Sequence, residues 1–214
     1  MLALDHIVVC GLEVEQTSEK YGRQLPIKAI KGGEHENWGT NNYLAYFSND
    51  SYLEWLAVTD EEKAKHATNP LIKHLVHQLE QKKAGPFQFA LRTTDMDQYV
   101  QHFMEEGIPF SGPFSGEREK PDGTLLKWRM LFPQYDYEQE TLPFLIEWDE
   151  NHKEMDMSIL NPQAITSIEY NGIDIDQFSH IYQIRQRKLL KNQLSLQNAK
   201  ITFHDSDEFT FKLE

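Results

Sequence analysis

The sequence predicts an α+β fold in which paired βαβββ modules form a cup-shaped mixed sheet, followed by a third, partial βαβββ-like segment. Two observations carry this prediction. A short strand in the first half, Leu53-Glu54-Trp55, matches one in the second half, Ile146-Glu147-Trp148, and each holds one carboxylate inside an apolar run. Both strands close the same series of strand and helix signals, β-α-β-β-β. An internal repeat of this kind is stronger evidence for a fold than any single element.

The first module is expected over residues 1–60. Alternating apolar residues predict its strands, Gly11 ends the first of them, and acids at the start of the helical stretch favour a helix N-terminus. The expected elements, in chain order, are a strand at 2–10, a helix at 13–24 and strands at 27–31, 43–47 and 52–58.

Residues 61–85 are expected to form a polar helical connector, and 86–152 the second module. That module should contain a strand at 86–93, a helix at 96–106 and strands at 110–114, 125–132 and 144–148. The tail, 160–214, is expected to be a partial third module or a dimerisation segment. Its elements are a strand at 164–170, a helix at 175–184 and strands at 189–196, 200–204 and 208–213.

Composition narrows the class of protein. The 214-residue chain has a formal net charge of −13, which argues against a nucleic-acid-binding surface. Cys10 is the single cysteine, so an internal disulfide is excluded and a reducing cytoplasm is the expected location. The N-terminus has no basic segment typical of a signal peptide, and no apolar run reaches membrane-spanning length. We therefore expect a soluble cytoplasmic protein that binds neither nucleic acid nor membrane.

Four strands each carry a side chain that stands out as a metal ligand: His6, Glu54, Gln88 and Glu147. A carboxylate in a half-buried strand is costly unless a cation or hydrogen bonds compensate it. Two such strands, each preceded by a strand with a His or a Gln, indicate one divalent metal held between the two modules. The mixed N/O ligand set suits Zn, Ni, Co, Mn or Fe.

The alternation of side chains along a strand decides which of them can meet. In the last strand of the second module it separates a bulky face (Phe144, Ile146 and Trp148) from a mixed face that holds Glu147. We expect the bulky face to pack on helices and the mixed face to line the cup. The metal would then polarise a substrate carbonyl or enediolate, while Glu147 or Glu54 acts as the catalytic base.

Each of these residues also has a simpler structural explanation. A lone strand His is commonly a satisfied core residue, and a strand Glu commonly pairs with a cation. Arg92 and Arg129 could hold an anionic group of a substrate, or they could neutralise the carboxylates of Glu54 and Glu147 in a metal-free protein.

The segment 32–42 mixes Gly, an aromatic residue, a His and amides, and is expected to be a loop over the mouth of the cup. His35, Trp38 and Asn41 are its candidate substrate-binding residues. It could equally be a tight connection that needs glycine. His74, on the connector helix, is expected at the surface.

Several of these segments together resemble the vicinal oxygen chelate superfamily, and within it the glyoxalase-like branch. The resemblance rests on Leu4–Val9, on the segment Gly33–Asn41, on Tyr52-Leu53-Glu54, and on Trp128-Arg129 followed by Pro143–Trp148, and it covers about residues 2–150. It implies a cup around one divalent metal whose ligands are His6, Glu54, Gln88 and Glu147. Gln88 stands where a His is commoner, which counts against an extradiol dioxygenase.

The resemblance implies a metal-dependent lyase or isomerase that acts on a small oxygenated compound. A metal-free module that sequesters a small molecule, as bleomycin-resistance-type relatives do, is the alternative. A homodimer is also expected, because such folds often close their cup by pairing.

Overall fold

The computed structural model describes residues 1–11, 16, 19–20, 26–119, 123, 125–149, 157–186, 192–205 and 209–214. The helix predicted at 13–24 lies mostly outside the described residues. The described elements are β1 (Ala3–Cys10), β2 (Ile30–His35), β3 (Thr40–Phe47), β4 (Ser51–Val58), α2 (Glu61–His66), α3 (Pro70–Glu80), β5 (Gly85–Arg92), α4 (Met96–Glu106), β6 (Phe110–Glu119), β7 (Leu125–Pro133), β8 (Phe144–Trp148), the 3-10 helix η2 (Met157–Ile159), β9 (Ile165–Tyr170), α5 (Ile175–Ile181), β10 (Gln193–Ser195), β11 (Lys200–Phe203) and β12 (Thr210–Leu213).

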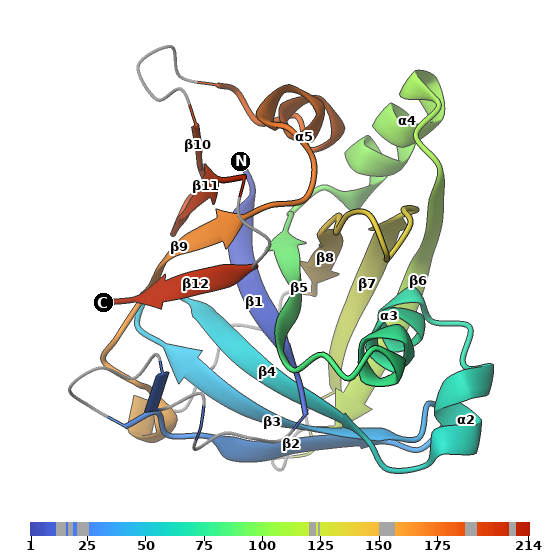
Figure 1. Cartoon of the computed structure of the whole chain (residues 1–214), viewed down its shortest axis with the longest axis vertical. Helices are drawn as coiled ribbons and strands as arrows, with labels where there is room; N and C mark the ends of the chain where they lie inside the picture. The colour runs from blue at the N-terminus through green and yellow to red at the C-terminus, as the bar shows by residue number, and fades with distance from the viewer. Residues whose placement is uncertain are drawn as a thin grey trace.

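The paired modules form one curled sheet of eight strands in the order β2-β3-β4-β1-β5-β8-β7-β6 (Figure 1). At its centre β1 and β5 pair antiparallel, with Ile7 opposite Phe89. On each side the last strand of a module lies parallel to the first, β4 beside β1 and β8 beside β5. The strand order is therefore the same when read outward from β1 and from β5, and the predicted α+β cup of paired modules is confirmed.

The tail forms a second sheet of four strands in the order β10-β11-β9-β12 (Figure 1). Here β9 is followed by α5, β10 and β11, and β11 returns parallel to β9 as β4 does to β1. The unit has one strand fewer than a full module. β12 pairs antiparallel with the remaining edge of β9, the place that β5 takes beside β1. The predicted third, partial module is thus present, whereas the exact domain boundaries stay a prediction.

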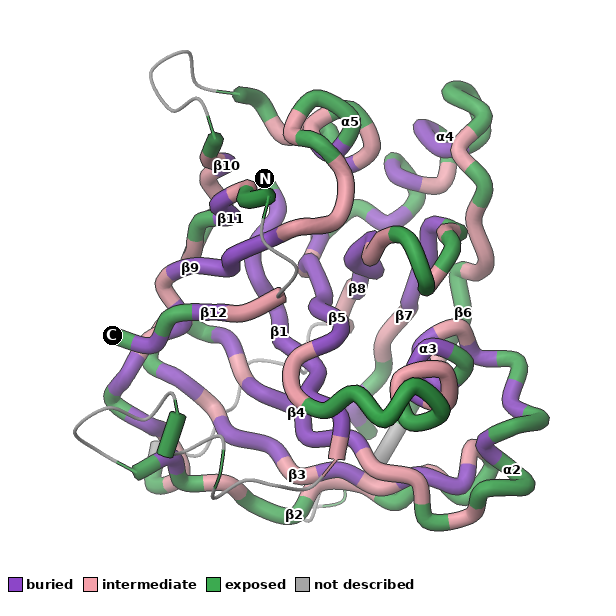
Figure 2. Tube along the Cα trace, in the orientation of Figure 1, coloured by how far each residue is buried: buried purple, intermediate pink, exposed green. Residues whose placement is uncertain are grey.

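The central strands of the large sheet, β1, β4, β5 and β8, are mostly buried on both faces, because each face has a cover (Figure 2). One face, called here the α4 face, packs against α4, α5 and the small sheet, with Trp55, Phe89 and Phe103 among the fully buried residues of this core. The other, called the His6 face, packs against the connector helices through Ile72 and Leu75. The connector is therefore a structural layer as well as a link.

Two predictions about local structure are wrong. Residues 32–42 do not form a loop, because β2 runs through Gly32 and Gly33 and pairs with β3, with a register shift between Lys31 and Glu34. His74 is buried, at 1% exposure, because α3 presents it to the His6 face rather than to solvent. No helix among the described residues is long and apolar enough to cross a lipid bilayer.

Candidate active site

The centre of the candidate site is His6, which lies between two carboxylates on the His6 face. Its Nδ1 donates a hydrogen bond of 2.7 Å to Asp5, and its Nε2 lies 3.5 Å from Oε2 of Glu54. The ring stacks on Tyr52, with centroids 4.5 Å apart, and meets the edge of Phe144. These contacts fix the ring plane and direct Nε2 at Glu54.

Asp5 reaches the same face as its neighbour because of a backbone irregularity. In a regular strand adjacent side chains point to opposite faces. The β1–β5 register shifts between Leu4 and His6, so Asp5 is an extra residue in a bulge and lies beside His6. Bulges of this type commonly re-aim side chains next to active sites.

The Asp5 carboxylate is completely buried and fully paired with partners. Besides His6, it accepts hydrogen bonds from Trp148 Nε1 at 2.9 Å and from Arg92 at 3.4 Å. Burial is the largest influence and raises the pKa of the Asp5 carboxyl, but these hydrogen bonds and the charges of His6 and Arg92 outweigh it and hold that pKa below its ordinary value. Asp5 is therefore a permanent anion behind the imidazole.

Glu54 is held on the opposite side of His6 by a second chain of contacts. Asn42 Nδ2 donates a hydrogen bond of 2.5 Å to Glu54 Oε1, and the backbone N–H of Gly33 donates one of 2.7 Å to Asn42 Oδ1. Gly32 makes room for this amide, since a Cβ there would lie 2.1 Å from Asn42 Oδ1. The glycine pair thus positions the Asn42 side chain that orients Glu54.

Gln88 lies on the same face, but both ends of its amide already have partners. Its Nε2 donates to the hydroxyl of Tyr135 at 2.6 Å and to the carbonyl of Leu142 at 3.0 Å, while its Oε1 accepts from the backbone N–H of Phe89. The Tyr135 hydroxyl also lies 3.0 Å from His74 Nδ1. Burial raises the pKa of Tyr135 well above its ordinary value, so this network is neutral.

Glu147 lies on the α4 face, opposite the other three. Its Oε1 accepts a hydrogen bond from the backbone N–H of Met96, at the start of α4, and its Oε2 is bound by Nε and Nη2 of Arg129 at 2.9 and 2.5 Å. The bulky face of β8 packs on helices as expected, but it lies on the side of His6, and the mixed face with Glu147 points away from His6. The bulky face of Phe144 and Ile146 packs with the connector helices in the core of the His6 face, and the acid satisfies a helix N-terminus instead.

The four predicted ligands do not fit a single metal ion. Only His6 and Glu54 face each other, the amide of Gln88 is occupied, and the Glu147 carboxylate is bound on the far side of the sheet. Across the described part of the chain, no group of three or more His, Cys, Asp or Glu side chains is arranged to hold a metal.

The other predicted substrate-binding residues are spread over three places. His35 and Trp38 lie at the turn of the β2–β3 hairpin, where His35 hydrogen-bonds Thr40. Asn41 is the register neighbour of Ala57 and points away from the face that holds Asn42, its sequence neighbour. Arg92 joins the site through Asp5 and also binds Asp50 at 2.5 Å.

Arg129 is paired with Glu147 and with Asp97 of α4, the latter at 2.8 Å. This is the plainer of the two explanations considered for Arg129, in which it neutralises a strand carboxylate.

Asp5 and Asn42 are the site residues that the sequence prediction missed. Asp5 directly precedes His6, and strict strand alternation would place the two side chains on opposite faces. Asn42 adjoins the predicted Asn41. Both lie within one residue of a predicted position, so the sequence pattern indicated the region of the candidate site but not the strand register that brings its residues together.

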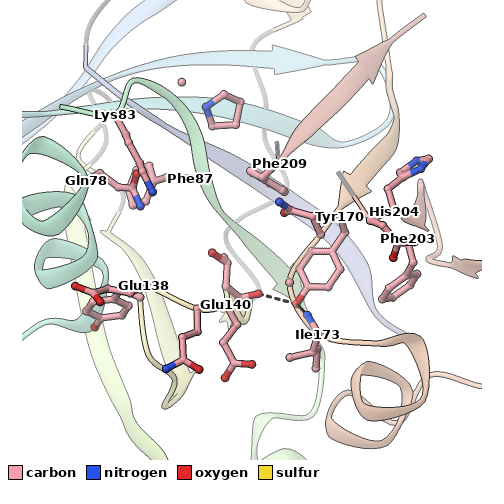
Figure 3. Close-up of a pocket in the computed structure, with 18 of the residues that line it drawn as sticks. Gln78, Lys83, Phe87, Glu138, Glu140, Tyr170, Ile173, Phe203, His204 and Phe209 are labelled. Carbon is pink, nitrogen blue, oxygen red and sulfur yellow. Dashed lines mark hydrogen bonds between the residues drawn. The ribbon is translucent and has the colours of Figure 1, made fainter. Parts of the chain in front are cut away.

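A large cavity lies away from His6 and Glu54. A cleft of about 1150 Å³ runs between the segment 83–87, the loop 137–141 and the small sheet (Figure 3). The Tyr170 side chain lines this cleft and donates a hydrogen bond of 2.7 Å to the Thr141 carbonyl. Gly172 leaves room for the Tyr170 side chain, because a Cβ at residue 172 would lie 2.2 Å from the Tyr170 hydroxyl.

Comparison with known proteins settles the family. A sequence model of the glyoxalase-like domain matches residues 4–184, most of the chain. The protein belongs to the glyoxalase-like domain family. No curated protein matches it.

Solved structures similar to this chain include a hypothetical protein from Staphylococcus aureus, which is 21% identical with a TM-score of 0.77 and aligns over 99% of this chain and 89% of that one. A methylmalonyl-CoA epimerase from Mycobacterium tuberculosis is 17% identical over 68% of this chain and 87% of its own, with a TM-score of 0.48. The Streptomyces coelicolor methylmalonyl-CoA epimerase in complex with 2-nitronate-propionyl-CoA is 19% identical over 70% of this chain and 97% of its own, with a TM-score of 0.48.

Proposed function

We propose that this glyoxalase-like protein is a cytoplasmic lyase or isomerase that moves a proton on a small oxygenated metabolite, with Glu54 as base and His6 as its proton partner. The observation that carries the proposal is the continuous chain Asp5–His6–Glu54, in which a buried anion holds the imidazole and the imidazole faces a second carboxylate. A His oriented by a carboxylate on one nitrogen is a common means of setting its tautomer for proton transfer.

The proposed step begins at a carbon next to a carbonyl. The Glu54 carboxylate removes a proton from that carbon, and the electron pair of the C–H bond moves into the carbonyl to give an enolate. In an isomerase the proton returns to the other face of the carbon or to the neighbouring carbon, whereas in a lyase the enolate expels a leaving group. His6 shares the proton with Glu54 through Nε2, and Asp5 stabilises the imidazolium that results.

The metal-dependent form of this function, implied by the family resemblance, requires His6, Glu54, Gln88 and Glu147 around one ion. Their placement on two faces of the sheet favours the acid–base form. The homodimer stays a prediction, and the molar mass of the purified protein in solution tests it.

Exchange of substrate protons with solvent tests the proposal, because it reports the first proton transfer whatever reaction follows. The protein is incubated in D2O with a panel of 2-oxoaldehydes, 2-oxo acids and hydroxy acids, and deuterium incorporation is followed by NMR. We expect exchange with at least one compound, lowered about 100-fold or more by Glu54→Gln and by His6→Gln. The matched control Glu61→Gln changes an exposed carboxylate of α2 and should leave the rate unchanged.

Exchange that is equally fast in Glu54→Gln overturns the proposed base. A compound that binds tightly with no exchange favours the alternative, a small-molecule-binding module of the same fold.

A further inference from the structure

The two matched strands contribute to the candidate site in different ways. In both of them a glutamate is followed directly by a tryptophan. In β4, Glu54 lies on the His6 face, and Trp55 is fully buried in the core of the α4 face. In β8 the faces are exchanged, because Glu147 lies on the α4 face and Trp148 on the His6 face. The His6 face therefore receives the glutamate of one strand and the tryptophan of the other.

The Trp148 side chain reaches across the sheet to the carboxylate behind His6. β5 lies between β8 and β1, and Nε1 of Trp148 donates a hydrogen bond of 2.9 Å to Asp5 Oδ2. The other oxygen of this carboxylate, Oδ1, accepts a hydrogen bond of 2.7 Å from His6 Nδ1. Each oxygen of Asp5 is thus bound by the N–H of a different ring, which limits rotation of the carboxylate.

Arg92 is a second donor to Asp5 Oδ2, and its contact is weaker than that of Trp148. Its Nη1 lies 3.4 Å from Oδ2, beyond the usual length of a hydrogen bond. Its Nη2 binds the carboxylate of Asp50 at 2.5 Å, which draws the guanidinium toward the turn between β3 and β4. Trp148 therefore holds Oδ2 more closely than Arg92 does.

The indole of Trp148 is itself fixed on the His6 face. Its ring lies against that of Trp128, with centroids 5.3 Å apart and planes inclined at 53°. Trp128 in turn lies against β6 at Gly116, where a Cβ would come within 2.4 Å of the indole. Packing of this kind fixes the direction of the Trp148 N–H. Catalytic groups keep a productive geometry when the residues behind them are locked by packing and hydrogen bonds.

We propose that Trp148 is a positioning residue for proton transfer: its indole N–H orients the Asp5 carboxylate, which directs Nε2 of His6 at Glu54. The inference goes beyond the proposed function and rests on it for the reaction that His6 serves. Trp148 acts through Asp5 rather than on a substrate. Its loss is therefore expected to change the rate of proton transfer and not the binding of the substrate.

Nuclear magnetic resonance of the full chain, labelled with 15N in histidine, tests the proposal without a substrate. The ring N–H signal that disappears in His6→Gln belongs to His6. In the wild-type protein this proton should exchange slowly with solvent, because it is bound to a buried carboxylate. Trp148→Phe keeps an aromatic ring but removes the indole N–H. It should speed the exchange of the His6 proton at least tenfold.

Trp55→Phe is the matched control, because it makes the same change in the other strand of the repeat, on the α4 face. Trp55 is fully buried and Trp148 is half-buried, so the control should lower stability at least as much. It should leave the His6 signal unchanged. In the deuterium-exchange assay, Trp148→Phe should lower the maximal rate about tenfold at unchanged KM, and Trp55→Phe should change neither.

An unchanged His6 signal in Trp148→Phe, or an equal change in Trp55→Phe, overturns the positioning role. If Trp148→Phe does not fold, the wild-type protein still gives a test. Its Trp148 indole N–H should exchange with solvent at least tenfold slower than in the unfolded chain, and unprotected exchange would exclude the hydrogen bond to Asp5.

The outcome is separate from that of the proposed function. A His6 signal that responds to Trp148→Phe in a protein without exchange activity would support the orientation of His6 by Trp148 and reject the proposed enzyme. Exchange activity that Trp148→Phe leaves at the wild-type rate would support the enzyme and reject the positioning role.

Discussion

At the scale of single residues, the decisive feature is which face of the sheet each polar side chain occupies. Alternation fixes the relation between neighbours in one strand, but it does not say which face meets a helix. Glu54 and Glu147 lie in nearly identical strands and end on opposite faces, one beside His6 and the other at the start of α4. The two similar strand sequences therefore place their glutamates in two different environments.

This difference predicts unequal effects of the two carboxylates on metal binding and stability. Glu147→Gln should lower the free energy of unfolding by about 1–2 kcal/mol, because it weakens the two-point contact with Arg129 and the hydrogen bond from Met96. It should leave the metal content of the purified protein unchanged. Elemental analysis and chemical denaturation measure the two effects. A stoichiometric metal that is lost in Glu147→Gln would restore the four-ligand site.

The two adjacent glycines of β2 should respond differently to the same substitution. Gly32→Ala places a methyl group 2.1 Å from Asn42 Oδ1, so Asn42 must leave Glu54 and stability should fall by about 1–3 kcal/mol. Gly33→Ala meets only the His35 side chain, at 3.4 Å, and is the matched control with a change of about 0.5 kcal/mol. Equal losses in the two variants, measured by chemical denaturation, would show that the Asn42 contact is not responsible.

At the scale of elements, α3 has a role that its polar composition conceals. The helix begins at the Asn69 cap and packs Leu71, Ile72 and Leu75 onto the His6 face. It also inserts His74, which stacks on Tyr137 with centroids 4.7 Å apart and lies beside the hydroxyl of Tyr135. The connector thereby closes the cup on the side of Gln88.

The buried His74 should make folding sensitive to acid. Burial, with smaller effects of His77 and Lys83, lowers the pKa of His74 from 6.5 to about 3. The folded state therefore keeps His74 neutral at pH values where the unfolded chain binds a proton on it. The contribution of the neutral His74 to the free energy of unfolding is complete above pH 6.5 and is lost as the pH falls toward 3. Between pH 6.5 and pH 5 the loss should be about 2 kcal/mol.

Denaturation curves at several pH values measure this slope. His74→Gln should flatten it, and His66→Gln, an exposed histidine of α2, should not. The same slope in His74→Gln and in the wild-type protein would show that another group is responsible.

At the scale of the whole molecule, the tail acts as part of the core rather than as an appendage. Asn198 connects it to the first module: its Oδ1 accepts from the N–H of Leu4, and its Nδ2 donates to the carbonyls of Leu4 and Asn49 at 2.9 Å. Asp50, next in the chain, binds Arg92, which in turn binds Asp5. The tail is thus connected to the candidate site by a series of polar contacts.

Loss of this connection should weaken the entire fold. Asn198→Ala should lower the free energy of unfolding by about 2–3 kcal/mol, because several buried partners lose their hydrogen bonds together. Unfolding should stay a single transition in chemical denaturation, since the core of the α4 face contains residues of both units. Gln197→Ala, an exposed neighbour, is the control. Separate transitions for the tail and the modules would contradict this.

The small sheet repeats the pairing geometry of the site with the residue types exchanged. His6 pairs with Tyr52, and Glu54 lies two residues further along β4. Likewise Glu169 pairs with Thr202, and His204 lies two residues further and contacts Glu169. Lys212 also binds Glu169, at 2.8 Å. This repeated geometry supports the assignment of the tail as a third, partial module. In the tail, the ammonium group of Lys212 lies beside the Glu169 carboxylate.

The sequence alone determined the order of elements and the three-fold repetition, because local periodicity and turn residues encode them. It also pointed to His6 and Glu54, the centre of the candidate site, since a buried charge in an apolar strand requires a partner wherever the strand lies. Only the tertiary structure decided which partner. Three features depend on contacts between segments far apart in the chain. They are the bulge at Asp5, the position of α3 beside Gln88 and the start of α4 beside Glu147. Strand alternation cannot reveal such contacts, because a shift of one residue moves a side chain to the other face.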